Sequence, residues 1–411
     1  MTDTNGVSTG RLKVALVCDW FLPRFGGLEM QLRDLAVRLA ALGHEVHVVT
    51  PIPGPEEVDG IRVHRLDVAL FPKYGFACTP RALREIRAVL RRESFDVVQC
   101  HVSYVSPIAF LGAYVSQQMA LPTVVTFHSF VGHFRKVLVA LDVMFGWSKW
   151  PVVFTAVSAV VAAQFRSRIQ HQPIHLLPNG VNSEDWRVEA SDRSPDSVHV
   201  VSVMRLKVRK RPRALLKIIR GVRQRLPQNL NLQVTLVGDG PLRPALERLI
   251  SRYSLGDTVN LVGHQSRDAI RKLFAQADVF VLPTVLESFG IAALEARLAG
   301  VPVVARVQSG ISEFITHGRE GLLADSDGQM TELLTELILD PGRRASIAAH
   351  NRATPGPATD WQQVVERHLE LYRDAIEMVR GVARNEPPSP DERPGPVAVQ
   401  ASSGTRVPVN E

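Results

Sequence analysis

Two glutamates, Glu287 and Glu295, flank the segment Ser288-Phe289-Gly290-Ile291, where an apolar strand-like run gives way to a helix-like one. Carboxylates accept hydrogen bonds from sugar or ribose hydroxyl groups, and free backbone N–H groups at a helix N-terminus bind an anion. The first acid should lie in the loop and the second about two turns into the helix. Taken alone, two surface acids on a helix remain the more frequent explanation of such a pair.

Basic residues gather directly after the first strand-like run of the second half of the chain. They are Arg205, Lys207, Arg209, Lys210, Arg211 and Arg213. Two of them could neutralise a diphosphate at the carboxyl end of that strand, and a solvated basic surface is the alternative.

Two further groups stand at the ends of strand-like runs in the first half. Gly26 and Gly27 open a helix and would let a ligand approach the backbone closely, although a tight turn also explains them. His128 ends a buried run, where a histidine is often a satisfied structural residue.

Two α/β domains would have to position these groups. Near-continuous apolar runs alternate with helical periods, as expected for parallel strands that helices cover on both faces. The predicted strands are 12–18, 45–49, 95–101, 122–127, 152–157, 174–177, 198–203, 232–237, 258–262, 279–282 and 301–305. The pattern predicts two Rossmann-like domains, with an active site in a cleft between the carboxyl ends of their strands.

The domain boundaries follow from breaks in this pattern. We expect a first domain over 11–187 and a second over 188–355, after a polar interruption of the apolar runs. An amphipathic helix within 356–383 should pack toward the first domain, and 1–10 and 384–411 should be disordered.

Composition narrows the class of protein. The 411 residues are 45% hydrophobic and 22% charged, which excludes a wholly disordered chain, and the net charge of +7 indicates an anionic partner. No nucleic-acid recognition motif accompanies the basic residues. The three cysteines have no metal-ligand spacing, the N-terminus lacks a secretory pattern, and no apolar run is long enough to span a membrane. We therefore expect a cytoplasmic protein.

Taken together and in order, the motifs resemble the retaining nucleotide-sugar glycosyltransferases of the GT-B fold that carry a Glu-x7-Glu motif, glycosyltransferase family 4. The resemblance covers about residues 11–379. It is carried by 19–29, Gly43-His44-Glu45-Val46, Thr126-Phe127-His128-Ser129, Pro178-Asn179-Gly180-Val181, Arg205 with Lys210, 236–240, Val262-Gly263, 277–283 and 287–295.

The resemblance implies a role for each site residue. Arg205 and Lys210 would neutralise the diphosphate leaving group, His128 would lie beside the transferred sugar, and Glu287 would bind sugar hydroxyls. Gly27, next to Gly26, would offer its N–H group to the donor phosphate. The donor site would be completed by Ser288, Phe289, Gly290 and Ile291 at the phosphate and sugar, Glu295 on the ribose, and Val262, Gly263 and His264 near the nucleobase.

Neither a metal nor a cofactor is implied beyond the nucleotide diphosphate sugar, a co-substrate, because fixed cations would stabilise the departing diphosphate. The triplet Asp325-Ser326-Asp327 only superficially resembles an acidic metal site. Met204 stands where the family often has glycine, and Asn182 where it often has aspartate. Both departures weaken the transfer of detailed donor geometry.

The nearest branch by motif contains the phosphatidylinositol N-acetylglucosaminyltransferases and bacterial phosphatidylinositol mannosyltransferases. This similarity implies transfer of mannose, glucose or N-acetylglucosamine from a GDP- or UDP-linked sugar to a phosphatidylinositol-type lipid. A soluble sugar, inositol phosphate or polysaccharide acceptor is one alternative, and a catalytically inactive sugar-nucleotide-binding module is another.

A basic helix gives the lipid hypothesis a physical basis. On the predicted helix 81–92, Arg81, Arg84, Arg87 and Arg91 lie on one side, and Leu83, Ile86 and Leu90 on another. Such a helix can rest on the inner, anionic face of a cell membrane or pack its apolar side against the sheet. The aromatic residues Phe145, Trp147 and Trp150, which follow Arg135 and Lys136, could be interfacial or buried.

Overall fold

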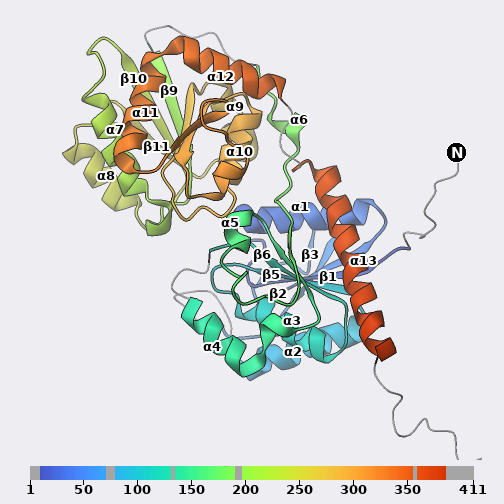
Figure 1. Ribbon diagram of the computed structural model, residues 1–411. Coiled ribbons are helices and arrows are strands. Elements are labelled where there is room, and N and C mark those ends of the chain that lie inside the picture. The colour runs from blue at the N-terminus through green and yellow to red at the C-terminus, as the bar shows by residue number, and fades with distance from the viewer. Residues whose placement is uncertain (1–9, 71–78, 131–134, 190–196, 355–358, 386–411) are drawn as a thin grey trace, which may run out of the picture.

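The protein is described by a computed structural model that covers residues 10–70, 79–130, 135–189, 197–354 and 359–385. Two sheets stand one above the other, each with helices on both faces (Figure 1). The predicted tail and N-terminal segment lie largely outside the described residues, although Arg384 and Asn385, assigned to the tail, belong to the last helix.

The first domain contains an eight-stranded sheet in the order β3-β4-β2-β1-β5-β6-β7-β8. All neighbouring strands are parallel except β3 and β4. Its elements are β1 (Lys13–Cys18), α1 (Gly27–Ala41), β2 (Glu45–Thr50), β3 (Glu57–Val58), β4 (Ile61–Arg65), α2 (Pro80–Glu93), β5 (Val97–Val102), α3 (Pro107–Gln118), β6 (Thr123–Phe127), α4 (Arg135–Phe145), η2 (Trp147–Lys149), β7 (Val153–Ala156), α5 (Ala159–Ala162), β8 (Ile174–Leu176) and α6 (Ser183–Trp186).

The second domain contains a fully parallel six-stranded sheet in the order β11-β10-β9-β12-β13-β14, the doubly wound arrangement of Rossmann folds. Its elements are β9 (Ser197–Val203), η3 (Val208–Lys210), α7 (Pro212–Arg223), β10 (Asn231–Val237), α8 (Arg243–Arg252), β11 (Val259–Gly263), α9 (Arg267–Ala275), β12 (Val279–Leu282), α10 (Ile291–Leu298), β13 (Val303–Arg306), η4 (Gly310–Glu313), β14 (Gly321–Ala324), α11 (Asp327–Leu339) and α12 (Pro341–Ala353).

Both faces of the first sheet are buried, which explains its consecutive apolar residues. Val14 and Leu16 of β1 pack with α1 and with α13 (Trp361–Asn385), whereas Ala15 and Val17 pack with α2 and α3. Because side chains alternate across a strand, continuous burial requires a helical layer on each side.

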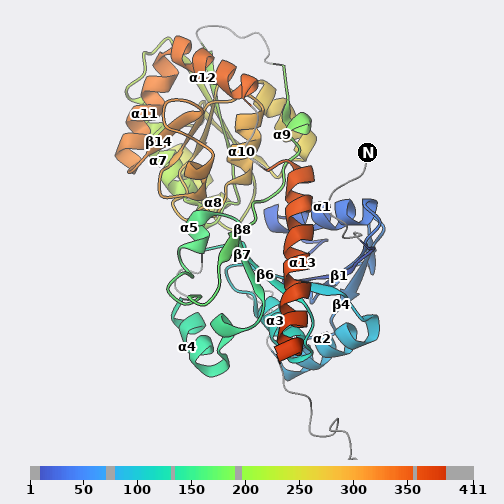
Figure 2. The same ribbon diagram turned by 45° about the vertical axis from the view of Figure 1, so that its right-hand side comes forward.

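The last helix, α13, crosses back from the second domain and lies along the first sheet (Figure 2). Its Tyr372 hydroxyl donates a 2.5 Å hydrogen bond to Oε1 of Gln99 on β5, and Gln99 Nε2 donates to Thr126 Oγ1 on β6. These buried polar groups satisfy one another.

The chain crosses between the domains twice, and the two crossings touch. The first, near Gly180, exchanges two hydrogen bonds with the Gln31 side chain of α1, at 2.8 and 2.9 Å. The second is joined to it where Val181 N–H donates to the Thr359 carbonyl at 2.8 Å. These contacts tie the connection between the domains to the first sheet.

Candidate functional site

The carboxyl ends of the two sheets face one another. Phe130, which follows β6, donates its backbone N–H to Ser288 Oγ at 3.3 Å, and Ser158, which follows β7, donates its hydroxyl to the Ser288 carbonyl at 2.5 Å. The Ser288 turn of the second domain is therefore held against the first domain.

A tight turn starts α10. Gly290 has φ +91° and immediately precedes the first helical residue, Ile291; a Cβ at Gly290 would lie 2.5 Å from Ile311 Cγ1. Glycine fits this left-handed, crowded position. Because α10 begins only at Ile291, Glu295 lies about one turn into the helix, and the expectation of two turns was wrong.

Lys210 and Glu287 form a close ion pair. The Lys210 ammonium donates to Glu287 Oε2 at 2.5 Å, and Glu287 is 8% exposed. Thr284 Oγ1 donates to the Lys210 carbonyl at 3.1 Å, which fixes the loop after β9 against the loop after β12. Both side chains therefore stand at one point on the second domain, facing the boundary.

Arg205 reaches across to the first domain. Its guanidinium donates to the Phe25 carbonyl at 3.1 Å and to both carboxylate oxygens of the buried Glu29 at 3.3 Å. A Cβ at Gly26 would lie 1.4 Å from Arg205 Nη2. Arg205 thus lies directly on the backbone of the glycine turn.

Gly27 and Ile291 also meet across the boundary, since a Cβ at Gly27 would lie 3.6 Å from Ile291 Cδ1. The structure consequently brings the N-terminal ends of α1 and α10, one from each domain, to the same region. Two helix N-termini with Arg205 between them form a favourable setting for an anion.

His128 follows β6 and pairs with another histidine. Its Nε2 lies 2.9 Å from Nδ1 of His101, the buried residue at the end of β5, and burial lowers the pKa of His128 to about 3. The imidazole is therefore neutral at physiological pH. It can exchange hydrogen bonds with a ligand but supplies no positive charge.

Glu295 is buried where the two domains meet. Burial raises its pKa to about 8, with the positive charge of Arg267 opposing and the negative charge of Asp34 reinforcing the shift. Arg267 of α9 and Asp34 of α1 form an ion pair at 2.8 Å across the boundary. Glu295 is thus largely protonated at neutral pH.

Val262, Gly263 and His264 lie at the end of β11. Gly263 has φ +72°, and the Gln265 side chain donates to the Val262 carbonyl at 2.8 Å. The His264 ring lies 6.0 Å from the exposed ring of Phe25, between centroids, so this strand end faces the loop between β1 and α1.

The acidic triplet after β14 is engaged in ion pairs. Asp327 accepts from Arg211 at 2.7 and 2.9 Å and from Arg306 at 2.7 Å. Arg211 therefore belongs to the packing of the second domain and not to a diphosphate site. Asp327 is a poor metal ligand because two guanidinium groups already occupy its oxygens.

His47, His64 and Glu93 form a group with metal-ligand chemistry at the opposite edge of the first domain. His47 Nδ1 lies 3.0 Å from His64 Nε2, Lys13 donates to Glu93 at 3.1 Å, and Arg92 lies 3.3 Å from His64 Nδ1. The two cations beside the group disfavour a metal ion, so we assign it no binding role.

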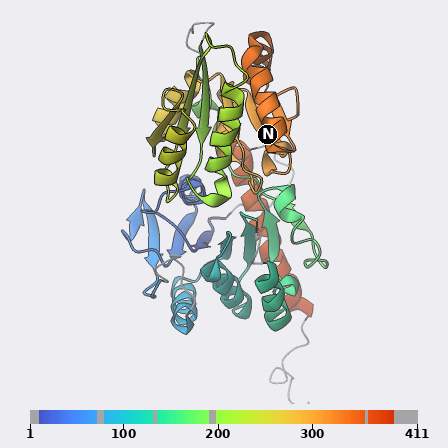
Figure 3. The ribbon, with the colours of Figure 1, turned by 90° about the vertical axis from the view of Figure 1, so that its left-hand side faces the viewer.

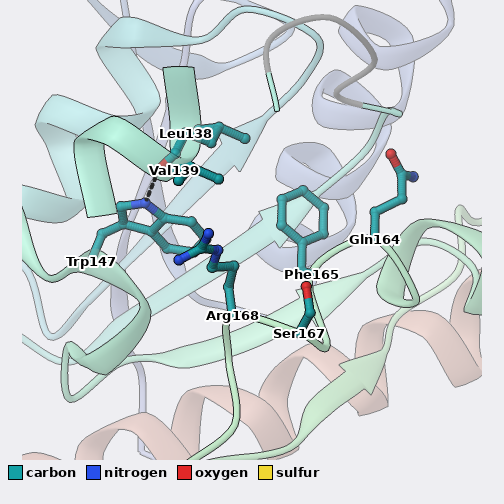
Figure 4. A pocket seen from close by; sticks show the side chains of 7 residues that line it. All are labelled: Leu138, Val139, Trp147, Gln164, Phe165, Ser167 and Arg168. Atoms are coloured by element: carbon teal, nitrogen blue, oxygen red, sulfur yellow. Dashed lines mark hydrogen bonds between the residues drawn. The ribbon is translucent and has the colours of Figure 1, made fainter. Parts of the chain in front are cut away.

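Two cavities lie away from the facing strand ends. One of about 60 Å³ separates α4 from the segment that contains Phe165 and Arg168 (Figure 4), and another of about 220 Å³ lies between α9 and α12. Both are smaller than the 300–1,000 Å³ typical of ligand sites.

Three residues at the boundary, Glu29, Ser158 and His101, were not anticipated as site residues, and a fourth, Arg209, was named only within a group of bases. An acid in the first helical turn after Gly-Gly is the signal that could have marked Glu29. Arg209 donates to the Leu286 carbonyl at 3.1 Å and lies 5.5 Å from the Tyr104 ring centroid. The sequence did not distinguish it from the other five bases of its segment. Ser158 and His101 carry no distinguishing pattern in the sequence.

Two family models match consecutive parts of the chain. "Glycosyltransferase Family 4" matches residues 25–185, and "Glycosyl transferases group 1" matches residues 186–354. Together they span both domains.

Relatives and a solved structure agree with this match. The chain is 26% identical over 377 residues to a phosphatidylinositol N-acetylglucosaminyltransferase subunit of Homo sapiens, covering 89% of this chain and 77% of the relative. It is 27% identical over 395 residues to the D-inositol 3-phosphate glycosyltransferase of Pseudarthrobacter chlorophenolicus, covering 86% and 91%.

The structure of Anabaena HepE in complex with UDP-glucose superposes with a TM-score of 0.65 at 19% identity, covering 91% of this chain and 100% of that one. At this identity the likeness concerns the fold, two Rossmann-like domains with their strand ends facing. With this GT-B fold and with family models matched across both domains, the chain belongs to glycosyltransferase family 4.

Proposed function

We propose that the protein transfers a hexose, with retention of configuration, from a nucleotide diphosphate sugar to an acceptor hydroxyl. One observation carries the proposal: Arg205, the Lys210–Glu287 pair and the N-terminus of α10 meet at the facing strand ends. The structural similarity to HepE, whose structure was solved in complex with UDP-glucose, supports a nucleotide-sugar donor.

Arg205 and Lys210 are the groups that stabilise the departing diphosphate. When the bond between the anomeric carbon and the phosphate oxygen breaks, negative charge grows on the diphosphate and positive charge on the sugar. Fixed cations at that position lower the barrier without a metal ion, and Glu287 orients the sugar through its hydroxyl groups.

Retention requires the acceptor oxygen to attack the face from which the diphosphate departs. In this scheme the acceptor proton passes to the leaving phosphate oxygen. His128 contributes a hydrogen bond to the sugar, because its neutral imidazole cannot act as a cation or as a general acid at physiological pH.

For the acceptor we propose a phosphatidylinositol-type lipid, supported by the similarity to the human phosphatidylinositol N-acetylglucosaminyltransferase subunit. No helix among the described residues combines the length and hydropathy needed to cross a bilayer. Access to a lipid would then require a surface that docks on the membrane.

Helix α2 presents only its basic side for such docking. Ile86 and Leu90 are buried in the core, so the apolar side of this helix packs inside the first domain, which is one of the two alternatives that the sequence left open. Arg81 pairs with Asp67 and Arg87 donates to Gln118, whereas Arg84 and Arg91 are exposed. Thr79 caps the helix by accepting from Ala82 N–H at 3.2 Å, which holds this basic side in place.

A soluble inositol phosphate is the second candidate acceptor. It is favoured by the 27% identity to an inositol 3-phosphate glycosyltransferase over almost that relative's whole length. The two acceptors share an inositol ring and an anionic phosphate, so the same site chemistry serves both.

The first test measures donor turnover. Purified protein is assayed for hydrolysis of GDP-, UDP- and ADP-sugars in the presence of EDTA, with Glu287→Gln and Lys210→Ala. We expect the wild type to use one donor and each variant to lose roughly 10²-fold or more in turnover, since each removes an interaction made at the reacting centre.

Controls are Glu332→Gln and Arg213→Ala, which change exposed residues of α11 and α7. Glu287→Gln and the two controls should keep the wild-type melting temperature, whereas Lys210→Ala, which leaves the buried Glu287 without its donor, should melt at a lower temperature. Normal turnover in Glu287→Gln would eliminate the proposed site, and no donor response in the wild type would favour an inactive binding module.

The α2 docking hypothesis has its own test. Arg84→Glu with Arg91→Glu should abolish sedimentation with vesicles that contain phosphatidylinositol, because the reversed charges repel the anionic surface. Arg248→Glu with Arg252→Glu, on exposed positions of α8, is the matched control. Unchanged sedimentation of the α2 variant would remove this helix from the docking surface.

A further inference from the structure

The last turn of α4 exposes three consecutive apolar side chains. Val143, Met144 and Phe145 are 83%, 68% and 46% exposed, and we refer to them as the α4 tip. Consecutive large apolar residues at such exposure are unusual on a protein surface and mark an interaction site.

The α4 tip is held by internal hydrogen bonds. Trp150 Nε1 donates to the Phe145 carbonyl at 3.0 Å, and Gly146 N–H donates to the Asp142 carbonyl at 2.7 Å. Asp142 in turn accepts from the backbone N–H and hydroxyl of Ser148 at 2.9 and 3.0 Å. The carbonyl groups of Asp142 and Phe145 are therefore satisfied inside the protein, which lowers the cost of bringing this turn into an apolar medium.

A second layer of aromatic residues supports the tip from below. Trp147 and Trp150 are buried, and Tyr114 of α3 contacts Phe145 and Trp150, with ring centroids 5.7 and 5.8 Å apart. Trp147 Nε1 donates to the Leu138 carbonyl at 3.0 Å (Figure 4). The exposed side chains thus stand on a rigid base.

Bases predominate in the part of the chain that carries the tip. From Val97 to Asn182 the sequence contains five Lys or Arg residues and one acid, Asp142, whose carboxylate is held by Ser148 and lies 4.0 Å from the Arg168 guanidinium. The exposed bases of this stretch are Lys136, Lys149, Arg166 and Arg168. An apolar tip beside exposed bases complements an anionic lipid surface, whereas exposed acids in their place would be repelled from it.

Helices α2, α3 and α4 lie side by side at the end of the first domain that points away from the second (Figure 3). The exposed Arg84 and Arg91 of α2 are therefore on the same end of the molecule as the α4 tip. Helix α4, about 16 Å long, begins five residues after Phe130, which bonds Ser288 at the candidate site.

We propose that the α4 tip inserts into an anionic lipid bilayer, with the surrounding Lys and Arg residues on the headgroups. The inference rests on the proposed function, because a bilayer at this end places a lipid acceptor beside the first domain. It adds an apolar anchor to the electrostatic contact of α2.

The experiment compares vesicle binding of full-length variants. Val143→Ser with Met144→Ser keeps Phe145 on Tyr114 and should lower partitioning into phosphatidylcholine–phosphatidylglycerol vesicles roughly tenfold or more, because methyl and methylene groups no longer leave water. Leu42→Ser with Leu339→Ser, at exposed apolar positions far from α4, should bind as the wild type does.

Insertion itself is read from a fluorophore. Met144→Cys labelled with an environment-sensitive dye should shift its emission to the blue on these vesicles and not on pure phosphatidylcholine, whereas Leu339→Cys should not shift. Equal partitioning of the serine double variant, or no shift at Met144, overturns the proposal. So does wild-type self-association that the double variant abolishes, because a second copy would then be the occupant.

Donor hydrolysis keeps the two proposals apart. The serine double variant should hydrolyse the donor at the wild-type rate, because the α4 tip lies outside the candidate site. Vesicle insertion without any donor turnover would remove the proposed function and leave the docking surface intact. Donor turnover without vesicle insertion would instead remove the docking proposal and leave the proposed function intact.

Discussion

Burial changes the charge that Glu295 carries at neutral pH. With its pKa raised from 4.5 to about 8, the folded protein retains a proton that the unfolded chain has released. The contribution of Glu295 to the free energy of unfolding is therefore fully present below about pH 4.5. It is lost as the pH rises toward 8, by at most about 1.4 kcal/mol per pH unit.

Glu295→Gln should remove this pH dependence. Its free energy of unfolding should exceed that of the wild type by an amount that grows from about pH 5 to about pH 8 and then levels off. Urea unfolding across this range measures the difference, with Glu332→Gln as control. Burial also raises the pKa of Asp19 to about 7, but Asp19 is present in both proteins, so its contribution cancels in the difference between their free energies of unfolding. Parallel curves for wild type and variant would contradict a protonated Glu295.

The sequence indicated Glu287 and Lys210 but not that they form a pair. Their contact joins loops that follow two different strands, and Arg205 finds Glu29 in the other domain, 176 residues away. Local patterns place a residue at the end of a strand. Which side chains then meet depends on how two separate sheets face one another, and no local pattern contains that information.

At the scale of elements, continuous apolar runs predicted most of the strands that carry the site. Strand β4 was not predicted, because Ile61–Arg65, next to the edge strand β3, alternates apolar with basic residues. Strand β14 was missed because it begins with glycine and has only four residues. The aromatic residues at the end of α4 and just after it differ in burial. Trp147 and Trp150 are buried, whereas Phe145 is exposed, because the end of the helix turns these neighbours in different directions.

Helix α13 depends on one buried polar contact with β5. In Tyr372→Phe, Gln99 Oε1 would lose its 2.5 Å donor inside the core. An unsatisfied buried acceptor costs about 1–3 kcal/mol, so the unfolding midpoint of the first domain should fall. Thermal unfolding measures it, with the half-buried Tyr253→Phe as control. Equal midpoints would show that another donor replaces the hydroxyl.

At the scale of the whole molecule, Arg205 on the Gly26 backbone couples the two domains. Gly26 has an extended φ of 178°, so alanine is conformationally allowed there, and its Cβ would displace the Arg205 guanidinium together with the Glu29 carboxylate that it contacts. Gly26→Ala should lower donor turnover roughly 10²-fold at an unchanged melting temperature. Gly256→Ala, where a Cβ meets no atom within 4 Å, should be neutral.

A double variant identifies the cause of that loss. If Gly26→Ala acts by moving Arg205, combining it with Arg205→Ala should cost little more turnover than Arg205→Ala alone. Additive losses would instead show that the new methyl group obstructs the donor directly.

The return of α13 to the first sheet has a consequence for how the protein is made. One face of that sheet is covered in part by residues such as Trp361 and Leu371, which the ribosome adds after the entire second domain. Residues 197–353 can therefore complete their own core while the earlier-synthesised domain still exposes part of its sheet. Although domains generally fold in the order of synthesis, here the first domain to emerge is the last to be finished.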